Sequence, residues 1–367
     1  MKYTAPYFAE VLQLLERLIA TPSLSRQEDA TATLLFEFLA HKGLKPQRQG
    51  HNVWVVAPQV DPSQPVLVLN SHHDTVPPVE GWQRHPFQPQ REGDRLYGLG
   101  SNDAGGPLVA LVATFLEVAK WSARTFNLVL ALTAEEEVSG AGGVAAILDR
   151  LSPVGGMPHA GVVGEPTSLR MATAERGLFV VDAQAVGKSG HAAYDGGINA
   201  IYEAMADIEW LRTYQFPKKS ELLGPVRMSV TQIEAGTRHN VVPDRCRFVI
   251  DVRTNDCYTN EEVWEVMQAH CRSQLVPRSL RLQPSRIDPD HPLVQAARRI
   301  GLECYGSLTL SDQALMPFPT VKMGPGDSLR SHTADEYIQL SELQEGIVRY
   351  IDLLGALCDT WRASVYC

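Results

Sequence analysis

The sequence predicts an α/β protein with a mostly parallel sheet, interrupted by a smaller α+β unit. Over residues 1–170, short and nearly continuous apolar runs alternate with segments of helical periodicity, as in parallel sheets covered on both faces. Over residues 174–285 the order changes to β-α-β-β-α, which is close to a ferredoxin-like unit. The 367 residues also exceed what one core of typical size holds. We therefore expect a main domain of residues 1–173 and 286–367, with residues 174–285 inserted.

The N-terminal elements alternate between helices and strands. Apolar residues recur at helical spacing over residues 8–19, and Ser25 with Glu28 matches a capping box before a second helix that ends near Gly43. Strand-like apolar runs then cover residues 52–57, 66–70, 126–133 and 161–164, with a helix around 108–116 between the second and the third. This alternation is typical of a sheet built from βαβ units.

The later elements are predicted in the same way. Strands are expected at 177–186, 226–234 and 245–253, with helices at 199–211 and from the Thr259/Glu262 box to about Arg272. The last helix is expected to follow a Ser341/Gln344 box and to end near Trp361.

The composition excludes several classes of protein. With 44% hydrophobic and 20% charged residues, the chain is balanced as globular proteins are, and not as disordered ones. The net charge of -9 gives no footprint for nucleic acid or an anionic membrane. The longest apolar stretch, residues 104–116, is shorter than the ~20 residues that span a bilayer. No C-x-x-C pair and no signal-peptide pattern occur, so we expect a cytoplasmic protein.

Residues that can bind metals follow the predicted strands at their carboxyl ends, where ligands bind in open α/β sheets. They are His72, His73 and Asp74 after the second run, the Glu135–Glu137 run after the third, Glu165 after the fourth, Asp103 in the loop before the 108–116 helix, and His332 late in the chain. So many close carboxylates need a counter-charge, which divalent cations supply. Imidazole and carboxylate ligands suit zinc, with cobalt or manganese as weaker fits. We predict two metal ions that share one carboxylate, with a further carboxylate as general base.

Spacing adds detail to this prediction. His72 and Asp74 point to the same side of an extended segment, so Asp74 can accept the ring N–H of a metal-binding His72. His73 then faces away. The neighbours Glu136 and Glu137 allow one carboxylate to bind metal while the other holds the nucleophilic water.

Seven segments in order resemble the two-zinc hydrolases that include acetylornithine deacetylase, succinyl-diaminopimelate desuccinylase, aminoacylase and carboxypeptidase G. The segments are SHHDTV, GLGSNDAGG, TAEEEVSG, VVGEPT, GKSGHAAY, RHNVVPD and SHTADEYI, and they span nearly the whole chain. Three positions depart from the family pattern: Glu135 replaces the usual aspartate, Gly105 replaces a common lysine, and His73 is an extra histidine.

The resemblance implies a role for each matching residue of the main domain. His72 and Glu165 would bind one zinc ion, Glu137 and His332 the other, and Asp103, before a cis bond to Ala104, would bridge them. Glu136 would be the general base, and Asp74 would orient His72.

The inserted domain would be the family's dimerisation lid, which implies a homodimer. Its His191 would reach the partner subunit's active site and stabilise the oxyanion. Asn240 and Arg253 match positions that contact substrate, and Arg176 is a further candidate for binding a carboxylate.

Structural roles are alternatives for several of these residues. Asp103 could cap the following helix, His191 could be a turn residue beside Gly190, and Arg253 could be a surface ion-pair partner. The extra His73 fits a packing or supporting role better than that of a ligand.

The expected reaction is hydrolysis of the N-acyl amide bond of an N-acyl amino acid, in which Glu136 deprotonates the attacking water and then protonates the departing amine. Resemblance to the acetylornithine deacetylase branch implies N-acetyl-L-ornithine as substrate, in arginine biosynthesis, with N-acetylcitrulline or an N-succinyl analogue as variants. Asp312 or Asp327 could bind a cationic side-chain amine. A dipeptidase or carboxypeptidase G-type metallopeptidase, and a non-catalytic binding protein on the same scaffold, are alternatives.

Overall fold

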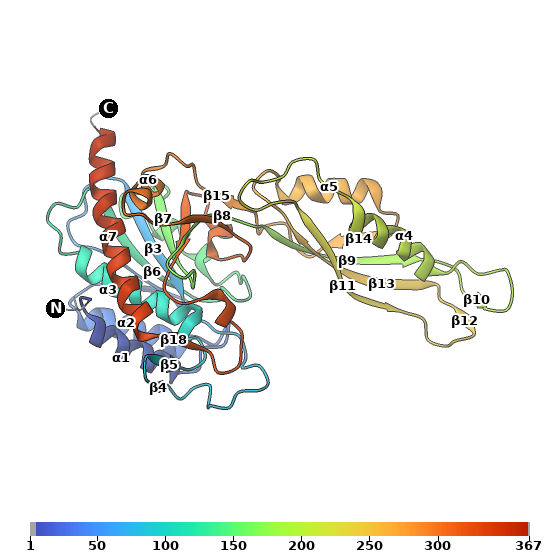
Figure 1. Cartoon of the computed structure of the whole chain (residues 1–367), viewed down its shortest axis with the longest axis horizontal. Helices are drawn as coiled ribbons and strands as arrows, with labels where there is room; N and C mark the ends of the chain where they lie inside the picture. Colours follow the sequence, from blue (N-terminus) through green and yellow to red (C-terminus); the bar gives the residue numbers. More distant parts are fainter. Residues whose placement is uncertain (1–4, 366–367) are drawn as a thin grey trace. The chain divides into compact units, whose positions relative to one another are not determined.

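The computed structural model describes residues 5–365, with side chains as far as Trp361. The chain divides into two compact units, and Figure 1 labels most of their helices and strands. The first unit takes in the chain as far as Thr173, Ile287–Tyr305 and the part from Ser311 onward, and the second comprises Ala174–Arg286 and Gly306–Leu310.

A nine-stranded sheet runs through the first unit in the order β1-β2-β6-β3-β7-β17-β8-β15, with β16 also paired to β8. The strands are β1 (Gln47–Gln49), β2 (Asn52–Val56), β3 (Val66–His72), β6 (Asn127–Thr133), β7 (Ala160–Gly164), β8 (Met171–Glu175), β15 (Ser285–Arg286), β16 (Cys304–Ser307) and β17 (Thr320–Met323). The four inner strands β6, β3, β7 and β17 are parallel, whereas β1, β2, β8 and β15 pair antiparallel. The predicted mostly parallel sheet is confirmed.

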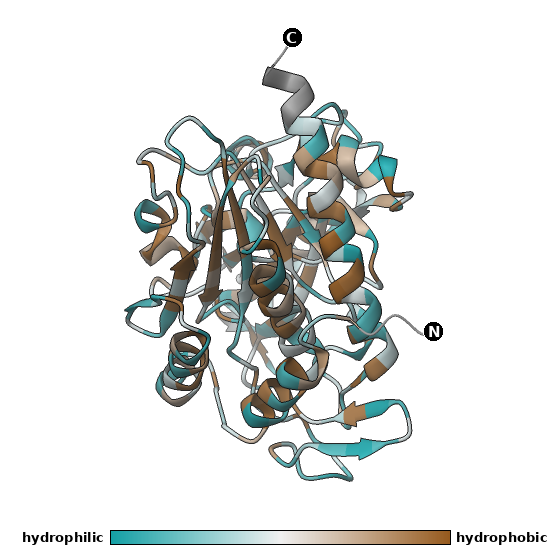
Figure 2. Ribbon diagram, turned by 90° about the vertical axis from the view of Figure 1, so that its left-hand side faces the viewer, coloured by the Kyte–Doolittle hydropathy of each residue, from teal (hydrophilic) through white to brown (hydrophobic). Residues whose placement is uncertain are grey.

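The inner strands are buried on both faces, which explains their continuous apolar runs. Every residue of β3 and β6 is buried. Leu67 and Leu69 of β3 face a core shared with the helices, whereas Val66 and Val68 face a second core built with Val144–Leu151 and the segment around Phe318. Figure 2 shows the central strands of this unit in brown, as hydrophobic.

Five helices complete the first core. They are α1 (Phe8–Ile19), α2 (Asp29–His41), α3 (Gly106–Val118), α6 (Pro292–Arg299) and α7 (Leu340–Val365). Helix α3 packs between β3, α1 and α7, and every residue of it except Glu117 is buried. A small sheet, β18-β5-β4, is formed by β4 (Gln90–Glu92), β5 (Arg95–Tyr97) and β18 (Tyr337–Gln339). Among the described residues, no helix is both long and apolar enough to cross a membrane.

Two of the three predicted capping boxes are wrong. Helix α2 has no side-chain cap, because Ser25 instead donates to Asp74 Oδ2 at 2.7 Å. Helix α7 begins at Leu340, so Ser341 lies inside it, and Ser341 binds Asp94. In both places a hydroxyl that could cap a helix makes a long-range contact instead.

The second unit has the ferredoxin-like order β-α-β-β-α-β. Its elements are β9 (Leu178–Val186), α4 (Ala200–Thr213), β11 (Arg227–Ala235), β13 (Arg245–Arg253), α5 (Asn260–His270) and β14 (Gln274–Pro277). The antiparallel sheet has the order β11-β13-β9-β14, and the sequence had not predicted β14. The Thr259/Glu262 capping box of α5 is confirmed. A two-stranded antiparallel sheet of β10 (Gly190–His191) and β12 (Val241–Val242) also belongs to this unit.

Candidate metal centre and active site

The parallel strands bring the predicted ligands to one edge of the sheet. β3 ends at His72, β6 ends just before the Glu135–Glu137 run, and β7 ends just before Glu165. β17 leads into the segment that carries His332. Because β6, β3, β7 and β17 are parallel, all four carboxyl ends lie on the same side.

One group of side chains that could hold a metal ion consists of His72, Asp103 and Glu165, whose donor atoms lie within 4.8 Å of one another. His72 Nε2 is 3.3 Å from Asp103 Oδ1 and 3.6 Å from Glu165 Oε1. The His72 ring is buried, and its two partners are nearly so.

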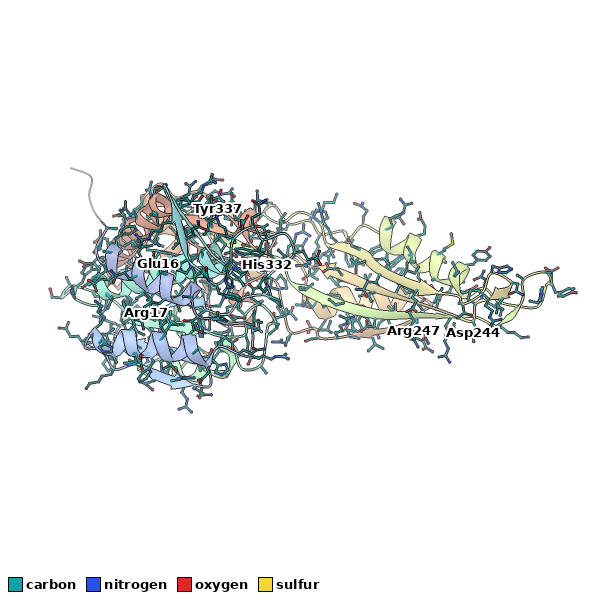
Figure 3. The ribbon with its side chains drawn as sticks, turned by 90° about the horizontal axis from the view of Figure 1, so that it is seen from below. Glu16, Arg17, Asp244, Arg247, His332 and Tyr337 are labelled. Carbon is teal, nitrogen blue, oxygen red and sulfur yellow. The ribbon has the colours of Figure 1, made fainter. Side chains whose placement is uncertain are left out.

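A second such group consists of Asp103, Glu137 and His332, again with donor atoms within 4.8 Å. His332 Nε2 is 2.9 Å from Glu137 Oε2 and 3.6 Å from Asp103 Oδ2. His332, labelled in Figure 3, is half exposed and is the open side of this group. Asp103 belongs to both groups and presents a different oxygen to each imidazole.

A tight turn, Ser101–Gly105, presents Asp103, and the Asp103–Ala104 peptide bond is cis. The buried carboxylate of Glu336 accepts the backbone N–H groups of Gly100, Asn102 and Asp103. Helix α3 begins after this turn without a side-chain cap, so the alternative that Asp103 caps it is wrong.

Asp74 lies beneath both groups and is fully buried. Nδ1 of His72, on the side of the ring away from Asp103, lies 3.1 Å from the carbonyl oxygen of Asp74 and 3.4 Å from its Oδ1. The same carboxylate accepts the backbone N–H groups of Glu136 at 3.0 Å and Glu137 at 3.2 Å. Asp74 therefore orients both an imidazole and the acidic loop, Glu135–Glu137.

Glu136 projects toward the same space but belongs to neither donor group. Its Oε2 lies 3.9 Å from His72 Nε2, and its side chain is 12% exposed. A carboxylate placed beside the ligands without joining them has the geometry that a general base requires.

The charges of the site indicate that it is built for cations. Burial, together with the nearby Glu165, raises the pKa of Glu136 well above its usual value, although the charge of His72 opposes this shift. Burial also raises the pKa of Glu137. The hydrogen bond to Glu137 raises the pKa of His332 to about 9. The direction of these shifts indicates a surplus of buried negative charge, which divalent cations would neutralise. The residues therefore fit a pair of metal ions.

The extra histidine, His73, faces away from both donor groups. Its Nδ1 pairs with Thr31 Oγ1 at 2.9 Å and its Nε2 with the carbonyl oxygen of His51 at 3.0 Å. Burial lowers the pKa of His73. A neutral ring that links two segments of the chain fits the expected packing role.

In the second unit, His191 and Asn240 lie together at the small β10/β12 sheet, where His191 ends β10 and Asn240 directly precedes β12. Ala192, next to His191, donates its N–H to the carbonyl oxygen of Asn240 at 3.0 Å. His191 is exposed, and its Nδ1 accepts the N–H of Ala193 at 3.1 Å. The ring therefore makes a turn contact, as the alternative expected, while the rest of it faces solvent.

Arg176 is the more unusual of the two arginine candidates. It is buried, donates to the carbonyl oxygen of Leu223, and leaves Nε and Nη1 without a hydrogen-bond partner among the described residues. Burial and the charges of Arg227 and Arg253 lower its pKa. Arg253 instead makes a two-pronged ion pair with Asp251, at 2.8 and 3.0 Å. The ion-pair alternative therefore describes Arg253, whereas Arg176 keeps free N–H donors.

Neither aspartate considered for a cationic substrate group is free. Asp312 is buried and accepts the Thr133 hydroxyl at 2.8 Å. Asp327 accepts the N–H of Leu329 at 2.9 Å, at the start of a short turn of helix. Burial raises the pKa of Asp312 to about 6. Both side chains serve local structure.

Sequence reasoning missed two carboxylates that support the site. Glu336 lies within the SHTADEYI segment, but the pattern of that segment predicts no role for it, and the spacing of Ser25 and Glu28 predicts only a capping box. Both are buried. A charged residue in a stretch that otherwise packs is the signal that could have found them.

The family model for Peptidase family M20/M25/M40 matches residues 68–356. The chain therefore belongs to this family of metal-dependent hydrolases, which act on acyl amino acids and peptides.

Relatives of similar length have related names. The chain is 27% identical to a succinyl-diaminopimelate desuccinylase of Delftia acidovorans, an alignment that covers 92% of this chain and 95% of the relative. It is 28% identical to an acetylornithine deacetylase of Edwardsiella ictaluri, with 89% and 92% covered.

Solved structures share the fold. The aminopeptidase PepT of Bacillus cereus matches with a TM-score of 0.75 at 18% identity, over 96% of this chain and 99% of that one. A dinuclear metal binding peptidase of the M20 family from Bacillus subtilis matches with a TM-score of 0.71 at 17% identity, over 96% and 99%.

Proposed function

We propose that this chain hydrolyses the N-acyl amide bond of an N-acyl amino acid with the help of two zinc ions, and that its substrate is N-acetyl-L-ornithine. The observation that carries the proposal is the pair of donor groups that share Asp103, with Glu136 beside them and in neither. A binding protein would have no use for such a carboxylate, which argues against the non-catalytic alternative.

The proposed ligands are His72 and Glu165 for one ion, Glu137 and His332 for the other, and Asp103 between them. Zinc fits imidazole and carboxylate donors, with cobalt or manganese as substitutes. A pair of bound divalent ions polarises a carbonyl oxygen and makes water nucleophilic at neutral pH.

Glu136 takes the proton of the attacking water and later gives it to the departing amine. A carboxyl group placed beside the ligands but outside both donor groups can accept a proton and release it again, as both halves of this cycle require. Asp74 fixes the geometry by holding the Glu136 N–H and the Nδ1 side of His72.

Residues of the second unit would bind the substrate. We propose that Arg176, with its buried and unpaired N–H groups, receives the free carboxylate, assisted by Arg253 and Asn240. His191, exposed at the end of β10, would stabilise the oxyanion in the active site of a partner subunit, so the working form would be a homodimer.

Two kinds of substrate, which differ in their acyl group, are candidates. N-acetyl-L-ornithine is supported by the SHHDTV and SHTADEYI segments and by the relative named acetylornithine deacetylase. An N-succinyl substrate is supported by several relatives named succinyl-diaminopimelate desuccinylase, at 26–30% identity.

A panel of substrates tests the proposal. It comprises N-acetyl-L-ornithine, N-acetyl-L-citrulline, N-succinyl-diaminopimelate and dipeptides, each with the zinc-loaded and the chelator-treated protein. We expect turnover of N-acetyl-L-ornithine that chelation abolishes. Preference for N-succinyl-diaminopimelate would move the assignment to that substrate, and preference for dipeptides would support the metallopeptidase alternative. Inactivity on every compound would contradict the proposal.

A further inference from the structure

Three successive backbone N–H groups of the acidic loop donate to buried carboxylates. Glu135 donates to Glu28 Oε1 at 3.1 Å, Glu136 to Asp74 Oδ1 at 3.0 Å, and Glu137 to Asp74 Oδ2 at 3.2 Å. The loop that carries the proposed base and a proposed ligand is therefore held from beneath by two side chains from distant parts of the sequence.

Glu28 does more than receive one N–H group. It is fully buried, its Oε1 also accepts the Arg26 N–H at 2.7 Å, and its Oε2 pairs with Nδ1 of His51 at 2.6 Å. The carbonyl oxygen of His51 in turn accepts from His73. Burying a carboxylate is costly unless every partner is in place, so this one fixes three chain segments relative to one another.

Glu336 is the matching carboxylate on the other side of the site. Its side chain is buried, its Oε1 accepts the N–H groups of Asn102 at 2.8 Å and Asp103 at 3.0 Å, and its Oε2 accepts that of Gly100 at 3.1 Å. It lies four residues after His332, so it ties the Asp103 turn to the segment of another ligand.

We infer, on the basis of the function proposed above, that Glu28 and Glu336 are positioning residues for the metal pair. Neither belongs to a donor group. Glu28 holds the N–H of Glu135, directly before the Glu136 and Glu137 that Asp74 holds, and Glu336 holds the backbone from which Asp103 projects.

The two residues should have different effects on metal binding. Glu137 belongs to one donor group, so loss of Glu28 should weaken the binding of one ion and leave the binding of the other unchanged. Asp103 belongs to both groups, so a defect at Glu336 should weaken the binding of both ions.

The chemistry of glutamine makes the test sharper. In Glu28→Gln the amide oxygen can still accept the Arg26 and Glu135 N–H groups while the NH₂ group donates to His51 Nδ1. This variant should therefore keep its metal binding. In Glu336→Gln every oxygen faces N–H donors, so the new NH₂ group must oppose at least one of them.

The experiment is a calorimetric titration of the chelator-stripped full chain with Co²⁺, after circular dichroism has established that each variant is folded. We expect two bound ions per chain for the parent and for Glu28→Gln. Glu28→Ala should weaken one binding step by ~10–100-fold and leave the other nearly unchanged, and Glu336→Gln should weaken both.

Asp207→Asn is the matched control. Asp207 is also a buried carboxylate that accepts two successive N–H groups, those of Arg272 at 3.0 Å and Ser273 at 2.8 Å, but it lies in the second unit. This variant should bind Co²⁺ as the parent does.

Parent-like binding by folded Glu28→Ala, or equal loss in Asp207→Asn, would overturn the role of Glu28. If Glu28→Ala does not fold, Glu336→Gln decides the inference, and two unchanged binding steps there would overturn it. A parent chain that binds fewer than two ions would contradict the proposed function itself, which separates the two failures.

Discussion

At the scale of single residues, the side chains that meet at the sheet edge divide by what they can do. Asp103 faces an imidazole with each of its oxygens, whereas Glu136 lies beside the ligands and in neither group. Glu137, one residue further, pairs with His332. Neighbouring glutamates thus have distinct environments, and their substitutions should have distinct effects.

Glu136→Gln should abolish proton transfer while leaving metal binding intact. We expect kcat for the best substrate of the panel to fall by ~10²–10⁴-fold, because the amide cannot accept the proton of water. Metal content, measured by plasma mass spectrometry, should match the parent. Loss of metal from this variant would mean that Glu136 is a ligand and not the base.

Asp312→Asn should alter the pH dependence of stability. Burial raises the pKa of Asp312 from 3.8 to about 6, so ionising it opposes folding once the pH passes that range. Its stabilising contribution is thus present below about pH 4 and lost as the pH rises through about 6. In chelator-treated protein, the free energy of unfolding of the variant should exceed that of the parent. The difference should be on the order of 1–3 kcal/mol and should grow from pH 4.5 to pH 8.

Urea denaturation at several pH values measures this difference. Bound cations would favour the ionised carboxylate, so the gain should shrink in the metal-loaded protein. A difference between variant and parent that stays constant with pH would show that Asp312 does not titrate in this range.

At the scale of helices and strands, apolar runs predicted the elements that build the site. The runs at 66–70 and 126–133 are β3 and β6, and their carboxyl ends carry His72 and the acidic loop. Which side chains meet there could be inferred because parallel strands end on the same edge.

Capping boxes were predicted less well, because the same residues can make long-range contacts. Ser25 binds Asp74, which follows β3, and Ser341 binds Asp94. Local spacing holds no information on partners that are tens of residues away. The box at Thr259 formed because nothing distant competes for its hydroxyl among the described contacts.

Thr259→Ala should destabilise α5 without affecting the metal site. The substitution removes the acceptor for the Glu262 N–H, which typically costs ~1 kcal/mol. Urea denaturation should reveal the loss, and metal content should stay at the parent value. Loss of metal from the folded variant would contradict the independence of the two units in metal binding.

At the scale of the whole molecule, the change of pattern near residue 174 predicted a separate unit. In the structure this unit comprises Ala174–Arg286 and also Gly306–Leu310. The second segment has only five residues, which is too short for apolar periodicity to predict. The strand β14 was missed because Gln274–Pro277 has only four residues and a proline.

The proposed homodimer makes a prediction about mixed subunits. A His191→Ala chain and a Glu136→Ala chain should each be inactive, because one lacks the oxyanion donor and the other lacks the base. If His191 acts on the partner subunit's site, mixing them with subunit exchange should restore part of the activity, since some hybrid sites hold both groups. Full exchange without recovery would contradict a role across the interface.

The central claim is that side chains from separate parts of the chain gather around two neighbouring cations. Anomalous X-ray scattering at the zinc edge, from crystals of the zinc-loaded protein, tests it most directly. The account predicts two peaks ~3.5–4 Å apart, with Asp103 between them, one beside His72 and Glu165 and the other beside Glu137 and His332. A single peak, or zinc bound away from Asp103, would contradict it.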